Sequence, residues 1–387
     1  MATTYQQLCP VLFGVGAVDQ IGEKALEFGA RKAYCIYDKG VRDSGIARRV
    51  VEKLQAAGVE CTCFDQVQPD APDTLIDQIG GEVYGGGYQL VVGIGGGSSM
   101  DTAKAVSVLA DNPPPIRRYF ASQPEPPVFE QHAKLILVPT ASGTGSEVTI
   151  MSVVHDMEKE VKDAVLRHAD LAIVDPELTS SAPPIVTASS GLDAMSHAAE
   201  AYTSAGANPK ADLLAPRAIE LIAQNLEPAW RDGSNLECRT QLSFASNIAG
   251  MAFSDASVHV GHCAAHELGL RLHIPHGVGC AIALPVTIAF CADALPEKTR
   301  AIARALGVQV SDQTPAGEAG RLAADAVRDL MRRVEIPSLK QAGHSREEVL
   351  ACAEGAISNN WFHIMCPKPV DAAIMRELLG EMYDLYQ

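Results

Sequence analysis

The sequence has little positive charge, no CxxC motif and no apolar run long enough to cross a membrane. Its 387 residues include 31 Lys and Arg against 47 Asp and Glu, which gives a formal net charge of −16 at pH 7. So acidic a chain offers no counter-charge to nucleic acid or to an anionic membrane surface, and we expect neither as a partner. A small anionic substrate in a locally basic pocket remains compatible with this charge.

Targeting signals and disulfide patterns are also missing. The longest uncharged stretch, residues 277–292, falls short of the ~20 residues of a transmembrane helix and contains Pro285. The N-terminus lacks the basic segment and apolar run of a secretory signal. Ten cysteines are scattered along the chain, with Cys61 and Cys63 as the closest pair. This usage indicates reduced thiols, so we expect a cytoplasmic protein.

The two halves of the chain have different hydrophobic patterns. In the first half, short apolar runs at 32–37, 60–64, 90–94, 135–138 and 171–174 alternate with helical patterns at 46–57, 74–83 and 100–109. Strands separated by helices predict a doubly wound parallel sheet. After about residue 183 only helical patterns follow, at 213–223, 239–252, 297–306, 317–334, 346–357 and 371–385. We therefore predict an α/β dinucleotide-binding domain over 1–182 and an all-α metal-binding domain over 183–387.

A glycine-rich turn follows the apolar run at 90–94. Gly95, Gly96 and Gly97 precede Ser98 and Ser99, and a helix is predicted directly after them. Backbone N–H groups at such a turn, together with the helix N-terminus, bind phosphate. The pattern is not GxGxxG, so a tight strand-to-helix turn without a ligand explains it equally well.

Two further features favour a nucleotide. Asp38 follows the first predicted strand, where a carboxylate accepts hydrogen bonds from a ribose and repels a 2′-phosphate. The other explanation for Asp38 is a turn residue or helix cap. A second polar turn, PTASGTGSE at 139–147, follows another buried strand. Two such turns at neighbouring strand ends indicate a shared crevice.

The second half concentrates histidine. Asp193 and His197 are four residues apart and share one face of a helix. Five of the eleven histidines fall within residues 259–276, which include His262, His266 and His276. One Asp with three His can hold iron or zinc and leave a position open for a substrate. Not all five can be ligands, and we expect two to be core or supporting residues.

These segments together resemble the iron-containing, or group III, alcohol dehydrogenases. The matching motifs are GGGSSMDTAK at 95–104, PTASGTGSEVT at 139–149, GLDAMSHAAEAY at 191–202, and HCAAHELG at 262–269 with PHG at 275–277. The resemblance runs in order along nearly the whole chain. It implies an N-terminal nucleotide domain, a C-terminal metal domain and an active site between them.

The resemblance also implies roles for individual residues. The implied metal ligands are Asp193, His197, His262 and His276, and His266 is implied beside the nicotinamide as the catalytic residue. The implied nucleotide contacts are Asp38, Gly95, Gly96, Gly97, Ser98, Asp101, Thr140, Ser142, Thr144 and Lys162. The implied cofactors are NAD and Fe(II), with zinc as the alternative. The family also implies a homo-oligomer of two or more chains.

Departures from the family pattern leave the substrate open. Met151, Phe253, His259 and Phe362 are the residues we expect to line the substrate pocket. His259 lies three residues before His262, so on a continuous helix it would face the metal and contact a polar or anionic part of the substrate. Packing against a neighbouring helix is the competing interpretation.

The predicted reaction is hydride transfer between NAD(H) and a small primary alcohol or its aldehyde. The alternatives within this class are polyol oxidation of the glycerol dehydrogenase type and reduction of an acid-bearing aldehyde. A sugar-phosphate lyase would need a Lys and Arg cluster near the ligands, and the sequence has none there. A non-catalytic nucleotide or metal sensor is disfavoured by a ligand set with an open position.

Overall fold

The computed structural model describes residues 3–125 and 128–386, which form two compact units. The α/β unit comprises Gln7–Ala141 and Gly145–Ser181. The helical unit comprises the N-terminal segment ending at Gln6, the short segment Ser142–Thr144, and the chain from Ala182 onward. The segment Ser142–Thr144 thus belongs to the helical unit, although the chain on both sides of it belongs to the α/β unit.

A six-stranded sheet in the order β1-β8-β5-β4-β2-β3 forms the centre of the α/β unit, and every pair in it is parallel. Its strands are β1 (Val11–Phe13), β2 (Lys32–Ile36), β3 (Glu60–Phe64), β4 (Leu90–Gly95), β5 (Lys134–Pro139) and β8 (Leu171–Val174). The predicted parallel sheet is therefore confirmed. The antiparallel hairpin of β6 (Met151–Asp156) and β7 (Val161–Leu166) was not predicted.

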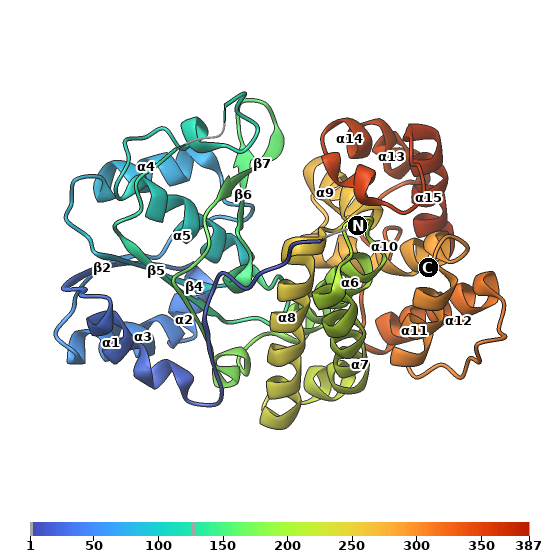
Figure 1. Ribbon diagram of the computed structural model, residues 1–387, viewed down its shortest axis with the longest axis horizontal. Helices are drawn as coiled ribbons and strands as arrows, with labels where there is room; N and C mark the ends of the chain where they lie inside the picture. The colour runs from blue at the N-terminus through green and yellow to red at the C-terminus, as the bar shows by residue number, and fades with distance from the viewer. Residues whose placement is uncertain (1–2, 126–127, 387) are drawn as a thin grey trace. The chain divides into compact units, whose positions relative to one another are not determined.

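Helices cover both faces of this sheet (Figure 1), with α1 and α3 on one side and α4 and α5 on the other. The helices of the unit are α1 (Ile21–Glu27), α2 (Lys39–Asp43), α3 (Ile46–Ala56), α4 (Asp73–Val83) and α5 (Gly97–Leu109). On one face, Ile21, Val50 and Leu54 pack with Val92 and Ile136 in a buried core. Because both faces are covered, β4 reads as a continuous apolar run instead of an alternating one.

The turn from β4 into α5 depends on two glycines. A Cβ at Gly93 would lie 2.6 Å from the Cβ of Ala103, so the missing side chain lets α5 pack closely on β4. Gly95 has φ +147°, a backbone conformation that other residues rarely adopt. The turn therefore delivers the first residues of α5 directly at the carboxyl end of β4.

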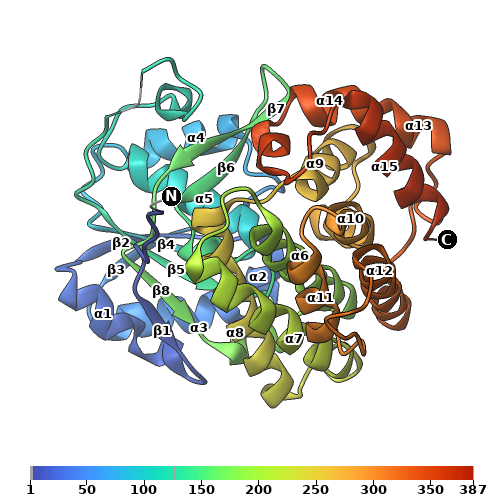
Figure 2. The ribbon, with the colours of Figure 1, turned by 45° about the vertical axis from the view of Figure 1, so that its right-hand side comes forward.

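The helical unit is built from ten α-helices among the described residues. They are α6 (Pro184–Thr203), α7 (Pro209–Arg231), α8 (Leu236–Ala256), α9 (Val260–Leu272), α10 (His276–Cys291), α11 (Pro296–Ala305), α12 (Ala316–Arg333), α13 (Arg346–Ala351), α14 (Ala353–Ser358) and α15 (Ala372–Asp384). The all-helical second half is therefore confirmed. Within it, α6, α7 and α8 pack side by side, and α10 packs against α6, α9 and α12 (Figure 2).

The most apolar of these helices is α10, which is buried along nearly its whole length. This burial makes α10 a core helix. No helix in the described part of the chain is both long enough and apolar enough to cross a membrane. A helix enclosed in this way cannot move without disturbing the core, so the residues at its start are held firmly.

Candidate active site

Four predicted ligands lie on three helices of the helical unit. Asp193 and His197 are one turn apart in the middle of α6, and His262 lies in the first turn of α9. His276 is the first residue of α10, directly after Pro275. The first three are buried, whereas the side chain of His276 is 29% exposed. His276 is therefore the one of the four side chains that is partly open to solvent.

The structure brings these four side chains together around one carboxylate oxygen. Asp193 Oδ1 lies 3.5 Å from Nε2 of His276 and 3.9 Å from Nε2 of both His197 and His262. The rings of His197 and His262 are stacked, with centroids 4.6 Å apart. Four donors from segments far apart in sequence thus point inward at one place.

The arrangement fits a divalent metal ion. Oxygen and nitrogen donors at ~2.1 Å from a tetrahedral ion lie roughly 3.4 Å from one another, close to the spacing seen here. Asp193 Oδ1 is buried and makes no hydrogen bond to any described residue. Burial lowers the pKa of His197 to about 4, so its imidazole is neutral at pH 7 and can bind a cation. A buried carboxylate oxygen of this kind needs a positive partner, which an ion supplies.

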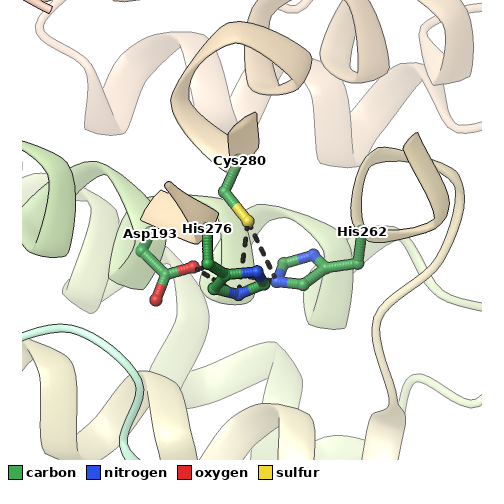
Figure 3. Close-up of side chains that lie close together, drawn as sticks. All are labelled: Asp193, His262, His276 and Cys280. Carbon is green, nitrogen blue, oxygen red and sulfur yellow. Dashed lines mark hydrogen bonds and ion pairs between the residues drawn. The ribbon is translucent and has the colours of Figure 1, made fainter. Parts of the chain in front are cut away.

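A fifth donor that sequence reasoning missed lies in the same place. Cys280 is on α10, one turn after His276, and its Sγ is 3.6 Å from Nε2 of both His276 and His262. Figure 3 shows the sulfur above the two imidazoles, with Asp193 beside them. The donor atoms of Asp193, His262, His276 and Cys280 all lie within 4.8 Å of one another. The four-residue spacing from His276 was the available signal, but the segment reads as an apolar core helix.

Glu200 holds His262 from behind. Its Oε1 lies 2.6 Å from Nδ1 of His262, and its Oε2 accepts the backbone N–H of His259 at 2.5 Å. Although burial opposes ionisation, the neighbouring His262 and His259 lower the pKa of Glu200 to about 2. An ionised Glu200 only accepts, so Nδ1 of His262 carries the proton and Nε2 faces the donor group. Sequence reasoning missed this residue because its role depends on the packing of α6 against α9.

His266 lies next to the donor group and is oriented by an asparagine. Its ring is 5.3 Å from that of His276 and 5.8 Å from that of Phe362. The amide nitrogen of Asn360 lies 2.9 Å from Nδ1 of His266, while Oδ1 of Asn360 accepts the backbone N–H of Phe362. The second bond fixes which end of the amide faces the ring. Nδ1 therefore accepts, and neutral His266 carries its proton on Nε2.

Two phenylalanine rings of the helical unit pack against His197 and His266. Phe253 lies almost parallel to His197, with ring centroids 4.3 Å apart and an interplanar angle of 13°. Phe362 is buried beside His266. Two of the four predicted pocket residues are therefore close to the donors. Met151 begins β6 in the α/β unit, where its carbonyl accepts a hydrogen bond from Lys104 Nζ at 2.7 Å.

The structure does not place His259 as expected. The prediction of a continuous helix through residues 259 and 262 is wrong, because α9 begins at Val260 and His259 has a non-helical backbone at φ −145° and ψ −124°. Its side chain is fully buried, with Nε2 2.9 Å from Oγ1 of Thr203. Its donor atom also lies within 4.8 Å of those of Cys291 and Cys366. The ring is thus part of the core, as the competing interpretation held.

In the α/β unit, the predicted nucleotide residues gather at the carboxyl ends of the central strands. Asp38 Oδ1 accepts the backbone N–H of Val41 and so caps α2, while Oδ2 lies 3.3 Å from Oγ of Ser99. Gly96 precedes α5, Gly97 begins it, and the N–H of Thr140 donates to the carbonyl of Gly95. Asp38 is therefore both a helix cap and a carboxylate next to the glycine turn.

Asp70, which sequence reasoning missed, joins two further candidates. Its backbone N–H donates to Oγ of Ser98 at 3.1 Å, and its carboxylate accepts from Nζ of Lys162 at 2.8 Å. Ser98 and Lys162 are thus brought together through one residue. Asp101 has a different setting, since its two oxygens accept hydrogen bonds from Ser146 Oγ and from the backbone N–H of Val153. Those bonds fasten α5 to the segments around it.

Two other nucleotide candidates belong to the helical unit. Ser142 and Thr144 lie in its short segment, where Oγ of Ser142 is 3.1 Å from Oγ of Ser243 on α8. Gly143 between them packs on Ser190, since a Cβ there would approach the Cβ of Ser190 to 2.8 Å. This polar turn is therefore fixed to α6 and α8.

Comparison with known proteins places the chain in a family. The model for "Iron-containing alcohol dehydrogenase" matches residues 10–176, and the one for "Fe-containing alcohol dehydrogenase family, C-terminal" matches residues 187–383. The chain is 34% identical to the choline dehydrogenase of Bacillus subtilis (strain 168) over 360 residues, which cover 92% of this chain and 89% of that protein.

Solved structures agree with this match. A crystal structure of 1,3-propanediol oxidoreductase is 31% identical, with a TM-score of 0.92 over 98% of this chain and 100% of that one. The sulfoacetaldehyde reductase of Bifidobacterium kashiwanohense, solved in complex with NAD+, is 28% identical, with a TM-score of 0.88 over 99% of each chain. The resemblance drawn from the motifs is thereby confirmed, and the chain belongs to the iron-containing alcohol dehydrogenase family.

Proposed function

We propose that the protein is an NAD-dependent oxidoreductase that interconverts a small primary alcohol and its aldehyde by hydride transfer. The observation that carries this proposal is the convergence of three imidazole Nε2 atoms on the buried Oδ1 of Asp193. Asp193, His197, His262 and His276 would hold the metal, iron(II) or alternatively zinc. When bound there, a divalent ion acts as a Lewis acid toward the substrate oxygen.

The residues around this site supply orientation and a proton. Glu200 fixes the tautomer of His262, so its Nε2 faces the donor group without a proton. Asn360 fixes His266 with its proton on Nε2, which suits proton donation to the substrate oxygen when an aldehyde is reduced. Phe253 and Phe362 place apolar rings next to His197 and His266.

The nucleotide would bind in the α/β unit. The glycine turn and the start of α5 offer backbone N–H groups to the pyrophosphate, and Asp38 offers a carboxylate to the adenosine ribose. Asp38 repels a 2′-phosphate, which favours NAD over NADP. The likeness to a reductase solved with NAD+ supports this choice.

His259 is no longer proposed as a contact to the substrate. Because His259 is buried and bonded to Thr203, it does not reach an acidic substrate tail in this structure. Relatives named for choline, 1,3-propanediol and sulfoacetaldehyde nevertheless define the panel to test. We also expect the chain to form homo-oligomers, which light scattering would measure.

The test uses purified protein, NAD or NADP, and a panel of alcohols and aldehydes followed by the absorbance of reduced nicotinamide. We expect turnover that requires a divalent metal and NAD. His262→Ala should remove most of the metal and the activity while NAD still binds, since Asp38 and the glycine turn lie in the other unit. Full metal occupancy in that variant, or turnover that a chelator does not affect, would overturn the assignment.

A further inference from the structure

The unusual feature of the donor group is a sulfur. Cys280 follows His276 by four residues on α10, so both side chains project from the same face of one helix. Cys280 is fully buried, and its Sγ is 3.6 Å from Nε2 of His276 and 3.6 Å from Nε2 of His262. Figure 3 shows the sulfur directed at the space between the two rings.

The spacing is that of two ligands on one ion. A thiolate at ~2.3 Å and an imidazole nitrogen at ~2.05 Å from a tetrahedral ion lie roughly 3.6 Å apart, which is the separation found to both rings. Sγ lies at this ligand-to-ligand distance from both histidines at once, which is stronger support for a shared ion than one such distance would be.

An independent observation points to a cation at the same place. Asp193 Oδ1 is buried, accepts no hydrogen bond from any described residue, and belongs to the same donor set. A carboxylate oxygen enclosed in this way is stabilised by a cation bound next to it. Asp193, His262, His276 and Cys280 thus form a set of four donors in which a sulfur joins one carboxylate and two imidazoles.

We propose that Cys280 is a metal ligand, and that its thiolate makes this site prefer a thiophilic ion such as zinc over iron(II). The inference rests on the proposed function, since it assumes that Asp193 and the histidines bind a metal. Imidazole suits both iron and zinc, whereas a soft thiolate shifts the preference toward zinc.

Cobalt reports this bond without any activity measurement. Metal-free protein is loaded with Co²⁺ alone, and the near-ultraviolet spectrum is searched for thiolate-to-cobalt charge transfer, to which nitrogen and oxygen donors do not contribute. We expect the band in the wild type and in Cys352→Ser, and its loss in Cys280→Ser with cobalt still bound. Cys352 is the matched control: it is buried in the helical unit, bonds the Glu348 carbonyl, and lies outside the donor set.

Affinity provides the second readout. In competition between zinc and iron(II), Cys280→Ser should reduce the preference for zinc by roughly 10-fold or more, as expected when a soft donor is replaced by a hard one. Cys352→Ser should leave the preference unchanged. An unchanged ratio in Cys280→Ser would contradict the proposal.

The outcomes distinguish a wrong role for Cys280 from the absence of a metal site. Cobalt binding without a charge-transfer band, or a band that survives Cys280→Ser, overturns the role of Cys280 and leaves the proposed function standing. Failure of the wild type to bind cobalt at all overturns the metal site itself. If Cys280→Ser does not fold, cadmium NMR on the wild type decides the matter, because one sulfur ligand moves the resonance far downfield.

Discussion

Oε1 of Glu200 lies 2.6 Å from Nδ1 of His262, and both groups are buried. The contact joins α6 to α9 and determines which nitrogen of His262 faces the donor group. The same carboxylate accepts the backbone N–H of His259. One buried charge therefore sets both the tautomer of a proposed ligand and the start of α9.

Glu200→Gln tests this arrangement. The amide keeps the shape of the side chain but loses its charge, so the histidine becomes a weaker ligand. We expect metal affinity to fall roughly 10- to 100-fold, the usual cost of losing a partner behind a ligand. Metal content after dialysis against a buffered chelator measures the change. An unchanged dissociation constant would show that Glu200 only holds the two helices together.

Asp38 should determine the preference for NAD. Asp38→Gly should weaken discrimination against NADP by roughly 1–2 kcal/mol, the value of a hydrogen bond to a charged group. Because Asp38 also caps α2, the control is Asp38→Asn, which keeps the cap but removes the charge. The ratio of kcat/KM for the two cofactors is the measurement. A wild type that already prefers NADP would show that Asp38 is a cap and nothing more.

His259→Ala should affect stability and not substrate choice. The change removes the hydrogen bond to Thr203 and leaves a cavity beside Cys291 and Cys366. We expect the free energy of unfolding to fall by about 1–3 kcal/mol. Thermal unfolding measures this, and 1-propanol and an acid-bearing substrate should lose kcat/KM by the same factor. A selective rise in KM for the acid-bearing substrate would restore the original expectation.

Asn360 should control the tautomer of His266. In Asn360→Asp the carboxylate only accepts, so it would draw the histidine proton to Nδ1 and leave Nε2 without one. If His266 donates a proton from Nε2, kcat for aldehyde reduction should fall roughly 100-fold. Nitrogen NMR of the imidazole reports the tautomer directly. A changed tautomer with unchanged kcat would remove His266 from the proton path.

The sequence is informative wherever local pattern dominates. The predicted strand at 90–94 and the helix after it correspond to β4 and α5, because an apolar run and a glycine turn are local signals. The pair Asp193 and His197 could be recognised as neighbours from helix periodicity alone. The four motifs together predicted the family, and the comparisons confirm it.

The roles of residues that depend on contacts between helices could not be predicted from local sequence patterns. Glu200 looks like any helical glutamate until α9 is placed against α6. The spacing of His259 to His262 predicts a shared helix face, but the backbone of His259 is non-helical and α9 starts one residue later. Cys280 was readable in principle from its spacing to His276, yet its neighbours are so apolar that core packing explained it equally well.

The donor group links segments that are far apart in the chain, since Asp193, His262 and His276 come from α6, α9 and α10. An ion bound there would link the three helices in the folded state, and the unfolded chain would not bind it in this way. Its binding energy would then add to folding, by about 2.7 kcal/mol when free metal is at 100 times its dissociation constant. The melting temperature of the protein should therefore rise with free metal concentration, and calorimetry across a chelator series would measure this rise.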